Sequence, residues 1–419
     1  MPILPAIEFP LIGNSLVIGL FALLHIVLAA LGVGFMMLVP LAEAAGETRP
    51  WLLEAARSMT RFTIVTYTAS LVLAVIMIDL FIGLFPLTNA YLFNRFRYPI
   101  FVAMIAFLLQ LFALYSYYHY WEALRARSPR IHWILGVLAA SLILIWVAVL
   151  DGIGSYMLTP STGDGAWSRL ANPTWAPLVV HRFLGNLVMA GYVVAGYAAW
   201  RLSAARAEDV DYYVRLLKAG LLVGFIMLMI QPLSGLFYAT AVSASAPEAY
   251  RQLMQGPYQP LIYTQFMLIA SLFLGSHLWL HQVVSTGSLE RWSIVAVGLF
   301  ALAMVLSVGY PDLRRMWTFA IVALSAVALY RSRSLFTDVS PAERYRRPVI
   351  RHLSTALAFV AVLTYLTMGI IRETARRPDT VRNVISLQDE ARQPAMDRPG
   401  APADEPRRPQ RGSEKRHGP

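Results

Sequence analysis

Apolar segments long enough to cross a lipid bilayer recur along most of this chain, and they restrict its possible folds more than any other feature. A transmembrane helix needs roughly 20 consecutive apolar residues. The bilayer core offers the backbone no hydrogen-bond partner, so such segments must form helices. We therefore predict an all-α fold, a polytopic membrane helix bundle with about ten transmembrane helices. The predicted spans are residues 13–39, 61–85, 98–121, 131–151, 174–200, 216–242, 260–283, 290–308, 313–330 and 350–371.

The composition supports a membrane protein and excludes several kinds of site. Of the 419 residues, 57% are hydrophobic and 14% are charged, whereas about a quarter of the residues in soluble domains are charged. The absence of cysteine excludes disulfides, zinc–thiolate sites, iron–sulfur clusters and covalently attached heme within this chain. The net charge of +11 comes mostly from arginines in short connections. It therefore reflects membrane topology, and no nucleic-acid partner is expected.

Basic residues are concentrated in the connections after the first, third, fifth and ninth spans, and the positive-inside rule places these connections on the inner side. The N-terminus is then predicted outside, and ten spans place the C-terminus outside as well. Residues 1–372 form the predicted bundle and residues 373–419 an extramembrane tail. After about residue 388 the tail is rich in Pro, Arg and Asp, which predicts disorder.

His181 is the most informative single residue, because it lies about two turns inside the span that follows the sequence NPTWAP. An imidazole in hydrocarbon must find a partner. It either hydrogen-bonds to a neighbouring helix or binds a metal or heme iron. Met267 lies seven residues past Pro260, in another span that begins on the outer side. A thioether and an imidazole at one depth could be the axial ligands of a low-spin heme, although most membrane methionines only fill space.

Two further residues near the predicted outer side are candidate ligands. His25 in the first span precedes a run of small residues, which suits either a flat ligand or a tight helix–helix seam. Glu373 follows the last span and is surrounded by Arg372, Arg376 and Arg377. The carboxylate is either an interfacial salt-bridge partner or an iron ligand, with the arginines binding heme propionates.

Other ionisable residues have weaker signals. Asp79 and Asp151 lie near the outer ends of their spans. Proton handling is a hypothesis for Asp79, while the glycines after Asp151 are equally consistent with a turn cap. Four histidines gather at the inner ends of spans three, four and seven: His119, His132, His277 and His281. The last two have the i, i+4 spacing of a metal site, but no third ligand is evident, so ordinary interfacial histidines are the favoured interpretation.

Taken together, His25, His181, Met267 and Glu373 resemble the ligand set of subunit I of cytochrome bd-type quinol oxidases. The matching segments are the early histidine of span one, GSYMLTPSTG with ANPTWAPLVVHRFLGNLVMAGY, YYHYWEAL, YTQFMLIASLFLG and RETARRP. The resemblance implies a high-spin heme histidine at His25 and a low-spin heme pair at His181 and Met267. It assigns the high-spin heme carboxylate to Glu373 and the motif arginine to Arg376.

Several positions depart from the family pattern, so the chain resembles a divergent member. Val102 and Gln110 stand where the family has two glutamates that serve a heme and a proton path. Gln265 replaces an arginine, and Arg377 and Asp379 replace a glutamine and a tryptophan. The connection between spans six and seven lacks the longer quinol-binding loop, and spans eight and nine look like an insertion. The candidate positions for a proton path are Asp79, Gln110 and Asp151, although a neutral Gln110 cannot carry a proton as glutamate does.

The resemblance implies a heme-binding subunit of a respiratory membrane complex. It would pass electrons between b-type hemes, two or three in number with heme d possible, towards oxygen reduction. The alternative is a heme b electron-transfer subunit without oxygen chemistry, which exchanges electrons with a cytochrome c or another membrane partner. A transporter ranks last. A second membrane subunit and a bacterial or archaeal inner membrane are expected, whereas the use of quinol stays open.

Overall fold

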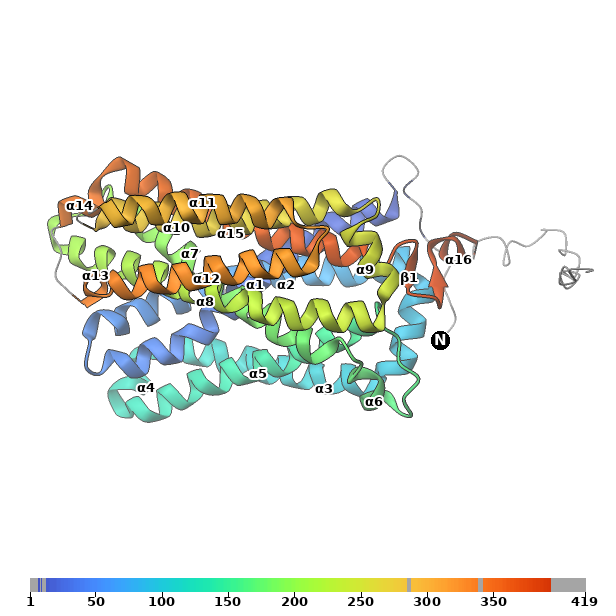
Figure 1. The fold of residues 1–419 in the computed structure, drawn as a ribbon. Coiled ribbons are helices and arrows are strands. Elements are labelled where there is room, and N and C mark those ends of the chain that lie inside the picture. The colour runs from blue at the N-terminus through green and yellow to red at the C-terminus, as the bar shows by residue number, and fades with distance from the viewer. Residues whose placement is uncertain (1–6, 8, 10–12, 285–287, 338–341, 393–419) are drawn as a thin grey trace, which may run out of the picture.

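The structure is a computed structural model that describes residues 7, 9, 13–284, 288–337 and 342–392. Ten long helices lie side by side along one axis (Figure 1). They are α1 (Asn14–Gly46), α2 (Pro50–Leu84), α3 (Pro86–His119), α5 (Pro129–Tyr156), α7 (Trp175–Leu202), α8 (Val210–Ser245), α10 (Gln259–Val283), α11 (Ser288–Leu306), α12 (Pro311–Arg331) and α15 (Pro348–Thr374). Within the described residues, nine of them are long and apolar enough to cross a membrane, and α11 contributes a shorter apolar helix.

The ten long helices correspond in order to the ten predicted spans, which confirms the predicted fold class. Several are longer than their apolar segments; α2, for example, has 35 residues and begins at Pro50 rather than near residue 61. Proline occupies the first turn of α2, α3 and α5, where its missing N–H costs no helical hydrogen bond and its fixed φ suits a helix.

Short elements cap the two ends of the bundle. At one end lie α6 (Ala166–Leu170), α9 (Pro247–Met254), the strands β1 (Asp379–Val381) and β2 (Ile385–Ser386), and α16 (Leu387–Arg392) (Figure 1). At the other end lie α4 (Trp121–Arg127), α13 (Ser334–Thr337) and α14 (Ala342–Arg346), and a 3-10 turn, Ala207–Asp209, precedes α8. Following the predicted topology, we call these the outer and inner ends. The orientation itself stays a prediction.

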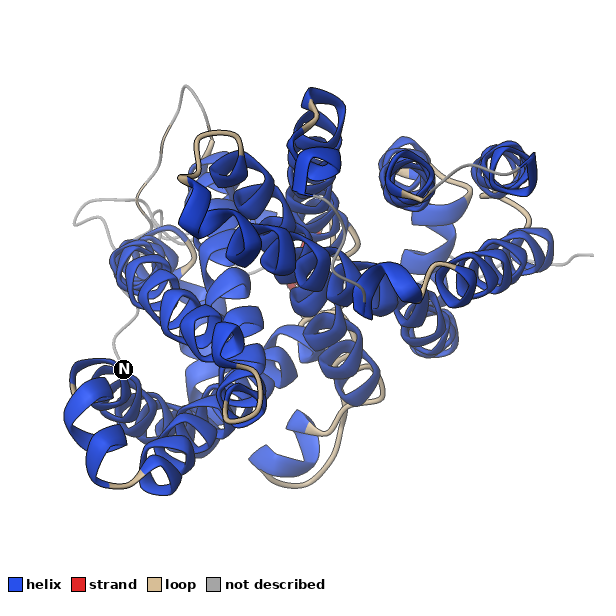
Figure 2. Cartoon of the chain, turned by 90° about the vertical axis from the view of Figure 1, so that its left-hand side faces the viewer, coloured by secondary structure: helices blue, strands red, loops and turns tan. Residues whose placement is uncertain are grey.

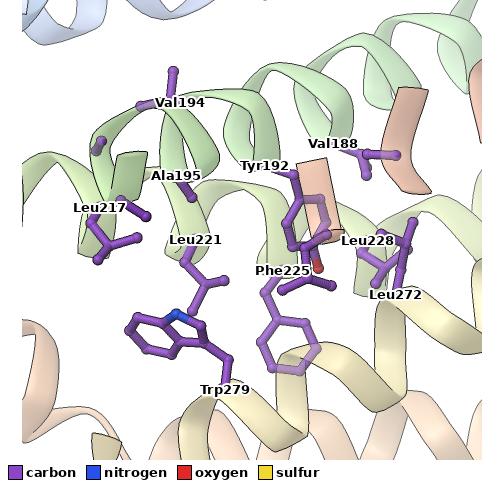
Figure 3. Packing of buried hydrophobic residues seen from close by; sticks show 14 of the residues in the cluster. Val188, Tyr192, Val194, Ala195, Leu217, Leu221, Phe225, Leu228, Leu272 and Trp279 are labelled. Atoms are coloured by element: carbon purple, nitrogen blue, oxygen red, sulfur yellow. The ribbon is translucent and has the colours of Figure 1, made fainter. Parts of the chain in front are cut away.

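The helices pack around two main cores. Figure 2 shows the helices from one end of the bundle. One core joins α1, α2, α3 and α5 around Tyr67 and Tyr117. The larger core joins α7, α8, α10 and α15 with part of α1. In the larger core, Tyr192 and Val188 of α7 face Phe225 and Leu228 of α8 (Figure 3).

The segment after the last long helix packs back on the outer end of the bundle. Strands β1 and β2 pair antiparallel. The Glu390 carboxylate accepts hydrogen bonds from the backbone N–H groups of Leu87 and Thr88, 3.1 and 2.6 Å away, at the start of α3. A carboxylate is favourable at a helix N-terminus. The predicted disorder after about residue 388 falls mostly on residues 393–419, which lie outside the described residues.

Candidate functional site

His181 lies half-buried in α7 with its ring against α8. Its Nδ1 lies 3.1 Å from the Ser234 hydroxyl and 3.2 Å from the Gln231 side-chain nitrogen. The Tyr238 ring stacks on the imidazole with centroids 5.9 Å apart. Gly235 lets α8 approach closely, because an added Cβ would lie 3.2 Å from His181 Cε1. The hydrogen bond expected to a neighbouring helix is therefore present. It uses Nδ1, and a metal-binding imidazole typically hydrogen-bonds a protein group through the ring nitrogen that does not bind the metal.

His25 is held in the same manner between α1 and α2. Its Nδ1 lies 3.0 Å from the Ser70 carbonyl oxygen and 3.1 Å from the Ser70 hydroxyl. Its Nε2 has no hydrogen-bond partner among the described residues. A ligating histidine typically donates one ring N–H to a carbonyl and offers the other nitrogen to the metal. The residues around His25 therefore fit an iron ligand.

The predicted common depth of His181 and Met267 is consistent with the packing of α7 and α10. The Tyr192 and Ser276 hydroxyls, one from each helix, are 2.7 Å apart and mark one level. His181 precedes Tyr192 by eleven residues, and Met267 precedes Ser276 by nine. At about 1.5 Å per residue, the two side chains lie roughly 16 and 14 Å outward of that level.

The direction of Met267 differs from the one that the ligand pair needs. At about 100° per residue, nine residues place Met267 on the side of α10 opposite Ser276. The Met267 side chain is 57% exposed, and no hydrogen bond of the described residues joins it to His181. Gln265 instead shares the face of Ser276, is 6% exposed, and leaves its Oε1 unpartnered. The His181–Met267 pair stays a prediction.

A buried ion-pair cluster lies beside His181 in the outer half of the bundle. Asp151 of α5 is 1% exposed and pairs with Arg182 of α7, while Arg372 of α15 lies 3.7 Å from the same oxygen. The Arg182 Nε donates to the Tyr365 hydroxyl at 3.3 Å. Two arginines facing one aspartate leave a net positive charge, which suits an anionic group. Asp151 thus lies within a helix, tied to two cations.

Glu373 and Arg376 form an ion pair at the end of α15. The Glu373 side chain is 61% exposed, whereas that of Arg376 is 11% exposed. Arg376 Nη1 lies 2.9 Å from the Met157 sulfur, and its Nε is buried without a partner. The interfacial salt bridge considered for Glu373 is present, and iron ligation by Glu373 stays a prediction.

The proton-path candidates have contrasting environments. Asp79 is exposed on α2 and has no ion pair among the described residues. Gln110 of α3 is fully buried and accepts a hydrogen bond from the Tyr67 hydroxyl, while its Nε2 has no partner. The structure therefore brings Gln110 into the interior and leaves Asp79 outside it.

Sequence reasoning missed a buried cluster at the inner end, where His132 was grouped with ordinary interfacial histidines. His132 is 0% exposed, and its Nδ1 lies 2.6 Å from the carboxylate of Glu43, which is 1% exposed. Tyr117 and Arg125 also donate to Glu43. The sequence contained a signal for this cluster, because Glu43, Arg125 and His132 all lie at the inner ends of predicted spans.

The other inner histidines have three different environments, and Nδ1 of His281 is buried without a hydrogen-bond partner. His277 is 2% exposed, and its Nε2 lies 3.0 Å from the Ser325 hydroxyl of α12. His119 is exposed and stacks on Tyr115. Across the described residues, no group of three or more His, Asp or Glu side chains could hold a metal ion.

These observations define a polytopic α-helical membrane protein with supported imidazoles inside its bundle. A family model described as cytochrome bd terminal oxidase subunit I matches residues 15–397, and the chain belongs to this family. Among solved structures, the chain is similar to the bd oxidase from Geobacillus thermodenitrificans. The identity is 15% and the TM-score 0.53, over 87% of this chain and 98% of that one, so the likeness concerns the fold. No curated protein matches the sequence.

Proposed function

We propose that this protein is the heme-binding subunit of a bacterial respiratory oxidase, located in the plasma membrane, and that His181 and His25 each ligate a heme iron. Family membership supports a respiratory oxidase subunit and a heme cofactor. When bound, b-type heme supplies reversible one-electron transfer, and an open axial position allows oxygen chemistry. A second membrane subunit and the heme number, two or three with heme d possible, are further parts of the proposal.

The observation that carries the proposal is the way α1 and α7 hold their histidines. Ser70 binds Nδ1 of His25 at 3.0 Å, and Ser234 binds Nδ1 of His181 at 3.1 Å. Each contact fixes the ring orientation and the tautomer with the proton on Nδ1. Nε2 of His25 is then available as a ligand, whereas Nε2 of His181 lies 3.4 Å from the Gln231 side-chain nitrogen, which a bound iron would displace. The Arg182–Arg372 cluster beside His181 offers positive charge to heme propionates.

Met267, Glu373 and Arg376 complete the proposed set of heme-binding residues. Met267 is proposed as the second axial ligand of the His181 iron on its depth and on the family motif, against the direction of its side chain. Glu373 is proposed as the carboxylate ligand near His25, with Arg376 as the motif arginine. The short connection at α9 supplies no quinol-binding loop, so no quinol site is assigned.

A second candidate function is electron transfer without oxygen reduction, to or from a cytochrome c or another membrane partner. It is favoured by the third helix, α3, in which Val102 and Gln110 provide no carboxylate. Binding of carbon monoxide to a reduced high-spin heme would support the oxidase, whereas low-spin heme b alone would support the carrier.

The test is spectroscopic and uses the full chain purified from membranes. A pyridine hemochrome assay and a reduced-minus-oxidised spectrum should show heme b in the wild type. His181→Ala should remove the low-spin signal, and His25→Ala should remove high-spin features while the low-spin signal remains. His277→Gln is the matched control, because His277 is a buried histidine that binds Ser325. Absence of heme from the wild type refutes the proposal, and an unchanged spectrum in Met267→Leu refutes the Met267 assignment.

A further inference from the structure

The cluster around His132 at the inner end combines groups that can bind and release protons, a carboxylate and an imidazole. Nδ1 of His132 faces the Glu43 carboxylate at 2.6 Å, and Nε2 faces the Tyr117 carbonyl oxygen at 3.2 Å. Both partners are acceptors, so the ring satisfies both only when each nitrogen bears a proton. Arg125 and the Tyr117 hydroxyl donate to the same carboxylate. Arg125 is 19% exposed, so the cluster lies one side chain from the inner surface.

A row of buried hydroxyls begins beside this cluster and follows α2 outward. The Thr60 side chain lies near Tyr117, and its hydroxyl donates to the Ala56 carbonyl oxygen at 2.8 Å. Thr63, Thr66 and Ser70 follow at intervals of three or four residues, which places them on one side of the helix about one turn apart. All four hydroxyl residues are less than 9% exposed.

Midway along the row, α3 adds a polar side chain that has an unused donor. Gln110 accepts from the Tyr67 hydroxyl, is 0% exposed, and has no partner for its Nε2. A buried amide N–H without a partner is costly, and an ordered water is the usual remedy. The interior of α1, α2 and α3 therefore has a donor suited to hold water beside the hydroxyl row.

The row ends at the proposed heme ligand. The Ser70 hydroxyl lies 3.1 Å from His25 Nδ1. Glu43 and His25 are eighteen residues apart on α1, which corresponds to about 27 Å along the helix. That distance approaches the hydrocarbon thickness of about 30 Å. Buried hydrogen-bonding groups thus recur at intervals from the inner end to the outer half of the bundle.

We propose that Glu43 and His132 take up protons at the inner surface and that Thr60, Thr63, Thr66 and Ser70, with water held by Gln110, conduct them towards the His25 site. Each hydroxyl oxygen accepts a proton from its inner neighbour and releases its own proton outward. One proton enters and one leaves, and the hydroxyls then rotate back. Where two hydroxyls are too far apart for a direct bond, one water bridges them. The inference rests on the proposed function, because oxygen reduction consumes the protons.

This route replaces the carboxylates that α3 lacks. Asp79 is exposed on α2, and Asp151 is bound to two arginines, so neither belongs to the row of buried hydroxyls. Buried Thr and Ser hydroxyls often only bond the carbonyl four residues earlier, and Thr60, Thr63 and Thr66 do so at 2.8–2.9 Å. A hydroxyl has one donor and two acceptor sites, so the oxygen can accept a proton while that bond is made, and the hydroxyl must rotate away from the carbonyl before it donates outward.

The test compares two threonines of α2 in the full complex. Thr63→Val removes a buried hydroxyl with little change of shape, and Thr68→Val removes an exposed one that bonds the Ile64 carbonyl and Tyr115. Proton uptake after an oxygen pulse, followed with a pH indicator, should slow about tenfold in Thr63→Val, the equivalent of one lost hydrogen bond. It should be unchanged in Thr68→Val. Heme content and spectra should match the wild type in both variants.

A second measurement does not depend on turnover. Reduced-minus-oxidised infrared spectra should contain the C=O signal of a protonated carboxyl group, which shifts in D2O and disappears in Glu43→Gln, while Glu47→Gln at the exposed C-cap of α1 retains it. Normal uptake in Thr63→Val with intact hemes overturns the proton route and leaves the proposed function standing. Absence of heme from the wild type overturns both.

Discussion

At the scale of single residues, the histidines of this protein differ in which ring nitrogen their neighbours occupy. His25 and His181 are both bound through Nδ1, by Ser70 and Ser234, and Nε2 of His181 also lies 3.4 Å from the Gln231 side-chain nitrogen. His277, which has no proposed ligand role, is bound through Nε2 by Ser325. Burial alone does not distinguish these residues, because His277 is more buried than either candidate ligand. The informative property is the Nδ1 contact that the two candidate ligands share and that His277 lacks.

Asp151 provides a prediction about stability. Among the described residues, Asp151 is the one carboxylate paired with Arg182 and Arg372, so Asp151→Asn leaves two largely buried cations without their counter-charge. Loss of one partner from a buried ion pair typically costs about 3–5 kcal/mol. We expect a clearly lower thermal transition in detergent, measured by circular dichroism. Asp312→Asn is the control, because Asp312 is 95% exposed in its pair with Arg315, and equal transitions for both variants would contradict the prediction.

At the scale of helices, α7 and α8 form the closest-packed pair around the candidate site. An added Cβ at Gly191 would lie 2.7 Å from Gly224 Cα and 2.8 Å from the Gly220 carbonyl oxygen. Small residues of this kind let helix backbones approach closely in membranes. The close approach positions Tyr192 against Ser276 and thereby sets the level of His181 relative to α10.

The α7–α8 seam gives a second prediction. Gly191→Ala places a methyl group against the backbone of α8, which cannot move aside as a side chain could. Overpacking of this kind costs about 1–3 kcal/mol, so we expect a lower thermal transition and a broadened His181-dependent heme spectrum. Gly298→Ala in α11 adds the same methyl group where nothing lies within 4 Å. The seam argument fails if both variants melt and absorb like the wild type.

At the scale of the whole molecule, the two ends of the bundle carry different chemistry. The ion-pair cluster of Asp151, the candidate ligands and the C-terminal hairpin lie towards the outer end. The Glu43–His132 cluster lies at the inner end beside α4. If the positive-inside orientation holds, a proton that enters near Glu43 and reaches His25 crosses most of the bilayer. The orientation of the bundle in the membrane therefore decides from which side of the membrane the proposed route takes its protons.

The absence of cysteine makes the orientation directly measurable. Ala126→Cys introduces a single exposed thiol at the inner end, and Asp164→Cys introduces one in the exposed outer connection between α5 and α6. In intact spheroplasts, a membrane-impermeable maleimide should label the cysteine at position 164 and should label position 126 only after lysis. The opposite pattern would reverse the predicted topology, and with it the direction of the proposed proton route.

The sequence by itself determined the membrane class, the number and order of the long helices, and the residues that stand out chemically. These properties depend on local free energies, since transfer of about 20 apolar residues into hydrocarbon favours a helix whatever its neighbours are. Helix ends were less predictable, because α2 extends to Pro50 beyond its apolar stretch.

Which side chains meet depends on how the helices pack against one another. Met267 and Gln265 lie two residues apart, yet the packing of α10 turns Gln265 inward and leaves Met267 57% exposed. Glu43 and His132 are 89 residues apart and meet only because α1 and α5 are neighbours. The rotation of each helix about its axis and its choice of neighbours arise from contacts between distant segments, which hydropathy does not encode.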